Sequence, residues 1–195
     1  KYNKGYSTRN YPYYVEGCSP QRLIDLSFRR RIIIQQEFFC SGLTGSQLEL
    51  SDTLRRLWME HVLWTRFFIL STAFSLPDLQ TVTDRLLRNP VDFAEALRPL
   101  YGEAKASQFK RLLTEHLTIA AALVNAAKAG NSAEVENQRR LWYRNAEAIA
   151  RFLASINGFW SEREWRKLLF DHLRMTEDEA VFILTGRYGE SVEVY

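Results

Sequence analysis

Residues 55–61 read Arg-Arg-Leu-Trp-Met-Glu-His, and the same short pattern returns further along the chain. The copies are Lys-Arg-Leu-Leu-Thr-Glu-His at 110–116 and Arg-Lys-Leu-Leu-Phe-Asp-His at 166–172, with a variant, Arg-Arg-Leu-Trp-Tyr-Arg-Asn, at 139–145. The pattern is two cations, Leu, a bulky apolar residue, any residue, an acid and then His. The only three histidines of the chain occupy its last position, and they are His61, His116 and His172.

Each copy lies in a stretch whose apolar residues recur every three or four positions, which predicts an amphipathic helix. Around His61 this stripe contains Leu57, Trp58, Trp64 and Thr65. Equivalent stripes surround His116 and His172, and Asn145 lies in one as well. We therefore expect these four polar residues to face an apolar core and the paired cations to face solvent.

The residues that begin and end helices between these stripes predict an all-α, antiparallel bundle of four main helices with short connecting and C-terminal helices. Its expected segments are Ser51 to about Ser75, Pro77–Arg88, Pro90 to before Gly102, Glu103–Ala129, Asn131 or Ser132 to Asn157, a helix capped by Ser161 with Glu164, and a last one capped by Thr176 with Glu179. Residues 48–195 form this bundle domain. Since no stop signal follows the last helix before Tyr195, we expect the native chain to continue.

Residues 1–47 differ from the rest and predict an extended N-terminal arm. Its first 20 residues contain five tyrosines among Gly, Asn, Ser and Pro, so they bury too little apolar area to order by themselves. The run Ile32–Ile34 favours a short strand. Two interpretations stay open: a loose extension, or an arm through which residues 1–45 mediate self-association.

Composition excludes several classes of protein. A length of 195 residues fits one core, and a net charge of +3 with acids among the cations argues against a nucleic-acid surface. No apolar run reaches the roughly 20 residues of a membrane span. We expect no signal peptide, which leaves a cytoplasmic or a spore- or cell-surface location. Cys18 and Cys40 form either one bridge or two free thiols.

The histidines are the candidate site. If the four patterns lie at one height of the bundle, His61, His116, His172 and Asn145 converge and can hold a divalent metal such as zinc or iron. The acids just before each histidine would be further ligands or would orient the rings; they are Glu60, Glu115 and Asp171. The alternative is a polar core network without metal, in which each ring donates to a carbonyl or an acid.

The sequence contains no motif typical of the other common kinds of catalytic or metal site. The glycines are dispersed, so there is no phosphate-binding loop, and no Gly-x-Ser-x-Gly elbow occurs. The Glu-x-x-His spacing of ferritin-like centres is missing as well, because Glu and His are adjacent here. The sequence therefore predicts either a bundle that binds a metal or small ligand at a buried level, or a structural protein that assembles through its arm.

Five stretches resemble a family of small helical proteins from spore-forming Firmicutes. They are Leu-Trp-Met-Glu-His-Val-Leu-Trp-Thr-Arg at 57–66, and the segments 85–93, 142–146, 154–157 and 172–176. The resemblance covers about Leu48 to Tyr195 and implies a bacterial, all-helical protein, without site residues. Members often carry the label acetylglutamate kinase. Kinases of that name have an α/β fold with glycine-rich loops, so we expect no kinase activity here.

Overall fold

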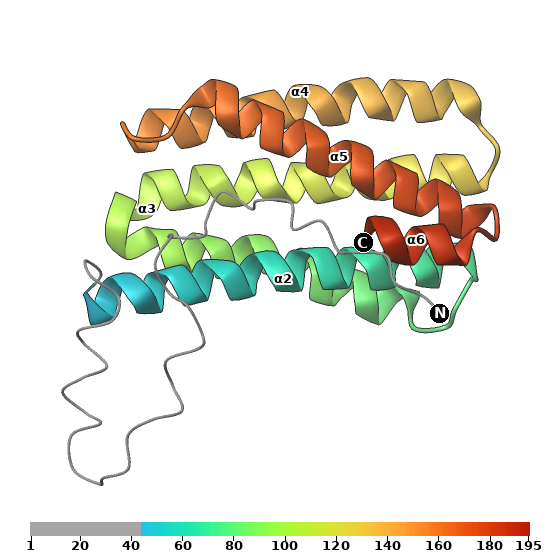
Figure 1. The fold of residues 1–195 in the computed structure, drawn as a ribbon, viewed down its shortest axis with the longest axis horizontal. Helices are drawn as coiled ribbons and strands as arrows, with labels where there is room; N and C mark the ends of the chain where they lie inside the picture. Colours follow the sequence, from blue (N-terminus) through green and yellow to red (C-terminus); the bar gives the residue numbers. More distant parts are fainter. Residues whose placement is uncertain (1–43) are drawn as a thin grey trace, which may run out of the picture. The chain divides into compact units, whose positions relative to one another are not determined.

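The computed structural model describes residues 44–195, and all of the regular structure in this range is α-helical. The helices are α2 (Gly45–Ala73), α3 (Leu79–Lys128), α4 (Ser132–Ile156), α5 (Glu162–Leu184) and α6 (Tyr188–Val194) (Figure 1). The predicted all-α class is confirmed. Of the predicted arm only residues 44–47 are described, and 45–47 already belong to α2; the strand at Ile32–Ile34, both cysteines and nearly all of the proposed assembly segment lie outside the described residues.

Residues 49–195 pack together as one unit. Within it α3 folds back on itself, as Figure 1 shows, because Gly102 interrupts the helix with φ 76° and ψ 169°. The helix arm before this glycine covers 79–101 and the arm after it covers 103–128. Both α2 and the second arm of α3 run in the same direction as α5, and the first arm of α3 and α4 run in the opposite direction (Figure 1). The predicted antiparallel bundle is thus present.

The predicted helix boundary at Asn89-Pro90 is wrong, because α3 continues through Pro90 and Pro99. A proline inside a helix removes one backbone hydrogen bond and costs about 3 kcal/mol. Here Asn89, Pro90 and Phe93 are all buried, and the Asn89 amide donates to the carbonyl of Leu57 on α2 at 2.9 Å. Packing against α2 therefore outweighs the local preference to end the helix.

The capping predictions are confirmed at α4 and α5 and wrong at two other places. The helix predicted to begin at Ser51 begins at Gly45, so Ser51 lies inside α2 and does not cap it. The Asn131 side chain accepts a hydrogen bond from the Glu134 amide at the start of α4, and Ser161 accepts one from Glu164 at the start of α5. Thr176 caps no helix, because α5 runs through it to Leu184. Its hydroxyl instead donates to the carbonyl of His172 at 2.9 Å, and the bundle ends in the separate helix α6 after Gly186 (φ 76°).

Two apolar clusters fill the interior. The first includes residues three or four positions before each histidine, namely Leu57, Leu113 and Leu169. The second includes residues eight positions after each histidine, namely Ile69, Val124 and Ala180. Because the three helices that carry them run in the same direction, the histidines lie between the two clusters. Among residues 44–195, none of the helices combines the length and apolar character needed to cross a membrane.

Candidate metal centre

The three histidines converge inside the bundle, as their positions in the repeated pattern predict. Ring centroids are 6.1 Å apart for His61 and His116, 5.6 Å for His61 and His172, and 6.1 Å for His116 and His172. One ring nitrogen of each lies within 4.8 Å of those of the other two. The level that these residues occupy is called the histidine layer below. Zinc–nitrogen bonds of about 2.0–2.1 Å would draw the rings inward by less than about 1 Å, so the three residues can hold a metal ion.

The rings of His61 and His116 are each oriented by an asparagine from an antiparallel helix. The Nδ1 atom of His61 lies 3.1 Å from Oδ1 of Asn89, and Nδ1 of His116 lies 3.0 Å from Oδ1 of Asn145. The amide nitrogens of these asparagines donate to the carbonyls of Leu57 and Leu112. Because a carbonyl can only accept, the asparagine oxygen is the atom that faces each ring.

The orientation of the two amides fixes the tautomer of the rings. An oxygen opposite Nδ1 requires that Nδ1 carries the proton and donates it. The second nitrogen, Nε2, then keeps its lone pair and is free to bind a metal. Metal-binding histidines typically donate their other N–H to an oxygen in this manner, which holds the ring in place and makes the ligand more basic.

Asn145 therefore lies at the centre as predicted, but it contacts the ring of His116 and orients it. Asn89, which orients the ring of His61 in the same way, was not predicted. The sequence did contain a signal, because Asn89 lies 56 positions before Asn145, the same interval that separates His116 from His172. An arginine precedes both asparagines. The seven residues that end at Asn145 resemble the seven that end at each histidine, so the repeated pattern groups Asn145 with the histidines and not with Asn89.

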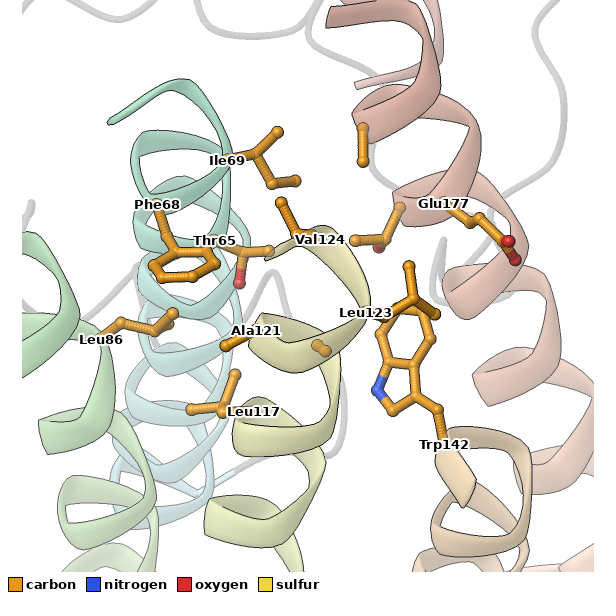
Figure 2. Close-up of a pocket in the computed structure, with 13 residues that line it drawn as sticks. Thr65, Phe68, Ile69, Leu86, Leu117, Ala121, Leu123, Val124, Trp142 and Glu177 are labelled. Carbon is orange, nitrogen blue, oxygen red and sulfur yellow. The ribbon is translucent and has the colours of Figure 1, made fainter. Parts of the chain in front are cut away.

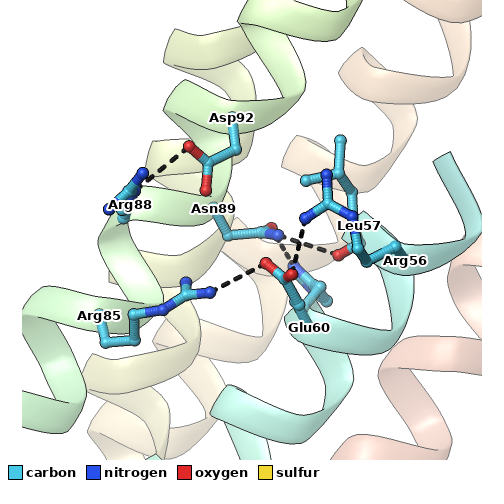
Figure 3. Close-up of polar contacts among 8 residues, drawn as sticks. Arg56, Leu57, Glu60, Arg85, Arg88, Asn89 and Asp92 are labelled. Atoms are coloured by element: carbon cyan, nitrogen blue, oxygen red, sulfur yellow. Dashed lines mark hydrogen bonds and ion pairs between the residues drawn. The ribbon is translucent and has the colours of Figure 1, made fainter. Parts of the chain in front are cut away.

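The three acids before the histidines point to other partners. Glu60 accepts hydrogen bonds from Arg56 at 2.8 Å and Arg85 at 2.9 Å (Figure 3), and the bond from Arg85 is the main reason that the pKa of Glu60 is lowered. The exposed Glu115 accepts from the Asn145 amide at 3.3 Å, so it supports the orienting residue. Asp171 pairs with Lys167 at 3.2 Å. None of the three belongs to the group of neighbouring ligand atoms, which contains histidines alone within the described residues.

Burial keeps the imidazoles neutral. It lowers the pKa of His61 to about 4, although the hydrogen bond with Asn89 opposes this shift. The pKa of His116 is lowered well below its ordinary value, first by burial and then by the charges that the other two rings would carry. His172 retains some exposed surface, but protein encloses its ring enough to lower its pKa to about 3, with His61 as the second cause. Neutral imidazole is the form that binds a metal.

His172 differs from the other two histidines in its surroundings. Within residues 44–195, neither of its ring nitrogens forms a hydrogen bond with an asparagine like those of His61 and His116. His61 and His116 also each contact a tryptophan at a centroid distance of 5.4 Å, Trp58 and Trp142 respectively. The partly exposed His172 is therefore the side of the layer closest to solvent.

No protein-family model, curated protein or solved structure matches the chain. The resemblance to the helical family of spore-forming Firmicutes accordingly stays a prediction, and the chemistry of the site is argued from its own residues.

Proposed function

We propose that this protein binds one divalent metal ion through the Nε2 atoms of His61, His116 and His172. The observation that carries the proposal is the pair of hydrogen bonds that two of the rings donate from Nδ1 to Asn89 and Asn145, which leaves Nε2 of these two rings unprotonated. In a polar network without metal, these rings would present two acceptors to each other in the core. No hydrogen bond joins the rings of the histidine layer within the described residues. A metal ion satisfies all of the lone pairs together.

Zinc fits this set of ligands better than iron. Zinc commonly binds three histidines in tetrahedral sites that keep one position for water or a substrate. Non-haem iron sites of oxygenases combine two histidines with a carboxylate, and di-iron bundles use several glutamates. At this centre Glu60 is held by two arginines, and Asp171 is paired with Lys167. We therefore propose zinc as the native ion, without assigning a reaction.

The test is the metal content of the purified protein after equilibration with zinc and removal of free ion. One zinc per chain is expected, and metal in 1,000-fold excess over Kd should stabilise the fold by about 4 kcal/mol. His116→Ala should abolish uptake. His172→Gln, at the partly exposed side of the layer, should abolish uptake with less risk to folding. The control is Thr118→Ala, which alters an exposed residue half a turn from His116.

A purified chain that retains no zinc and melts at the same temperature with zinc or with a chelator would contradict the proposal. The histidines would then form a polar core network, and His116→Ala would only leave a cavity and unpaired groups.

A further inference from the structure

The three histidines share a second spacing, which leads from each of them to the turn after its helix. Fourteen positions after each histidine, the chain has a residue with positive φ, in the left-handed region that commonly ends helices. These residues are Ser75 (φ 53°), Gly130 (φ 69°) and Gly186 (φ 76°). After the first two turns an antiparallel helix follows, and its asparagine lies 28 positions after His61 or 29 after His116. Gly186 therefore marks the turn of a third hairpin, in which α6 is the returning helix.

The helix α6 packs between α2 and α5 and runs antiparallel to α5 (Figure 1). Arg66 of α2 donates to the carbonyl of Ser191 at 3.2 Å, and its guanidinium lies 4.8 Å from the centre of the Tyr195 ring. Tyr188 of α6 also contacts Phe74, just after α2, with ring centroids 6.0 Å apart. The place of α6 between α2 and α5 thus corresponds to the place of α4 between the second arm of α3 and α5.

The helix α4 shows what a returning helix does at the level of the histidines. Trp142 points from α4 into the interior beside Leu123 of the second arm of α3 (Figure 2), and its ring lies 5.4 Å from that of His116. The next residue, Tyr143, packs on Phe170 of α5 with ring centroids 4.8 Å apart. A returning helix therefore covers the histidine of its own hairpin and an apolar side chain of the neighbouring helix.

The corresponding positions of the third hairpin are exposed. Met59 and Phe170 each lie two positions before a histidine, yet Met59 is 68% exposed. Leu168 and Leu57 each lie four positions before a histidine, and their exposed fractions are 40% and 1%. His172 is only partly buried, and within residues 44–195 no asparagine orients its ring. The side chains of Met59, Leu168 and His172 are together called the open face below.

We propose that the open face binds an antiparallel helix that continues α6, and that a side-chain oxygen on this helix accepts the Nδ1–H of His172. The repeat predicts this oxygen 28 or 29 positions after the histidine. A continuation of α6 fits this face better than a separate partner does, because α6 already has the required direction and lies between the same two helices.

Such a helix would bury Met59 and Leu168, and it would fix the tautomer of the third ring as Asn89 and Asn145 fix the other two. The bundle would then consist of three equivalent hairpins around the histidine layer. Docking of the helix does not depend on a metal. Its effect on metal affinity does rest on the proposed function, since an oriented ring is a better ligand.

The test extends the full chain after Tyr195 with a copy of residues 140–156 from α4. Tyr195 lies 23 positions after its histidine, as Arg139 does, so the copied asparagine falls 29 positions after His172. In hydroxyl-radical footprinting, Met59 should be labelled readily in the 195-residue chain and be protected in the extended chain. The extended chain should also melt at least about 4 °C higher, because apolar side chains are buried. It should bind zinc about 10- to 100-fold more tightly.

Two further variants separate docking from the hydrogen bond. An extension in which alanine replaces the asparagine should protect Met59 equally but give no gain in zinc affinity. Leu168→Glu should abolish the gain in melting temperature in the extended chain and have little effect in the 195-residue chain. Val181→Glu is the matched control, because Val181 is 44% exposed and lies nine positions after His172, on the opposite face of α5. It should leave the gain intact.

Labelling of Met59 that the extension leaves unchanged would overturn the docking of a helix on the open face. Protection of Met59 with equal zinc affinity for the asparagine and alanine extensions would overturn the hydrogen bond to His172. Failure of both chains to bind zinc, with Met59 protected in the extended one, would overturn the proposed function and leave the docked helix in place.

Discussion

His61 and Asn89 lie on antiparallel helices with their Nδ1 and Oδ1 atoms 3.1 Å apart, and the Asn89 amide donates back to the carbonyl four residues before His61. His116 and Asn145 repeat this arrangement at 3.0 Å, and the Asn145 amide again donates to the carbonyl four residues before the histidine. The bundle therefore contains two equivalent helical hairpins, α2 with the first arm of α3 and the second arm of α3 with α4. His172 occupies the same place on α5.

The first prediction concerns the orienting amide. Asn145→Ala removes the acceptor of His116 Nδ1–H and the donor to the Leu112 carbonyl, and both groups are in the core. Leaving buried polar groups without partners costs about 1–3 kcal/mol each, so the free energy of unfolding in urea should fall by at least about 2 kcal/mol. Zinc affinity should fall by about 10- to 100-fold, as for other residues that orient metal ligands.

Asn125→Ala is the control for this variant. The Asn125 side chain also donates to a carbonyl, that of Ala121, but it is exposed, so water replaces the bond. Its unfolding free energy and zinc affinity should match those of the wild type. If Asn145→Ala lowered stability but left zinc affinity unchanged, the asparagine would be a packing residue without influence on the ring.

The convergence of the histidines could be predicted from the sequence because it depends on helical spacing alone. Each histidine lies in the same phase of an apolar stripe, so burial places it in the core. The partner of each ring could not be predicted in this manner, since it depends on which helices pack antiparallel. The acids illustrate the same limit: Glu60 is adjacent to His61 in sequence, yet Arg85 on a neighbouring helix arm determines where its carboxylate points.

The helix boundaries show where local preference is decisive and where packing outweighs it. Gly102 ends a helix arm because its φ and ψ are accessible to almost no other residue. Pro90 does not end one because the residues around it are buried against α2. Local sequence carries the first kind of information, whereas the second depends on tertiary packing.

The second prediction tests Gly102. With φ 76° and ψ 169° it lies in a region that a residue with a Cβ atom enters only at a cost. Gly102→Ala should lower the unfolding free energy by about 1–3 kcal/mol. Gly158→Ala should have little effect, because Gly158 has an ordinary φ and nothing within 4 Å of an added Cβ. Thermal or urea unfolding of the two variants compares them directly, and equal stability would show that the hairpin tolerates other backbone geometries.

The third prediction concerns an ion pair that joins three helices. Arg66 on α2 contacts Glu179 on α5 and donates to the carbonyl of Ser191 on α6 at 3.2 Å. Burial raises the pKa of Glu179, and Arg66 opposes that shift. Glu179→Ala leaves a largely buried guanidinium without its partner, so the unfolding free energy should fall by about 3–5 kcal/mol.

Asp178→Ala is the adjacent control for the ion pair. Asp178 pairs with Arg174 at 3.4 Å, and both side chains are about half exposed, so less than about 1 kcal/mol should be lost. The double variant Arg66→Met with Glu179→Leu should recover most of the stability that Glu179→Ala loses. A double variant as unstable as the single one would mean that the fold depends on more than the pairing of these two charges.

The fourth prediction is a loss of stability of the metal-free protein between pH 6.5 and pH 5. The unfolded chain protonates its histidines near pH 6.5, whereas burial lowers the folded pKa of His61 to about 4 and that of His172 to about 3. Below pH 6.5 the unfolded state therefore binds protons that the folded state does not. The free energy of unfolding consequently decreases as the pH is lowered. Each histidine contributes at most about 1.4 kcal/mol per pH unit.

Urea unfolding at intervals from pH 7.5 to pH 5 measures this slope before most carboxylates begin to titrate. In His172→Gln one of the three histidines is replaced by a group that does not titrate, so its slope should be about one third shallower than that of the wild type. Saturating zinc should raise stability at pH 7.5 and lose this effect as the pH falls, because protons compete for the same nitrogens. A stability that stays constant from pH 7.5 to pH 5 would mean that the folded protein admits charged imidazoles, which is incompatible with the lowered pKa values of the buried rings.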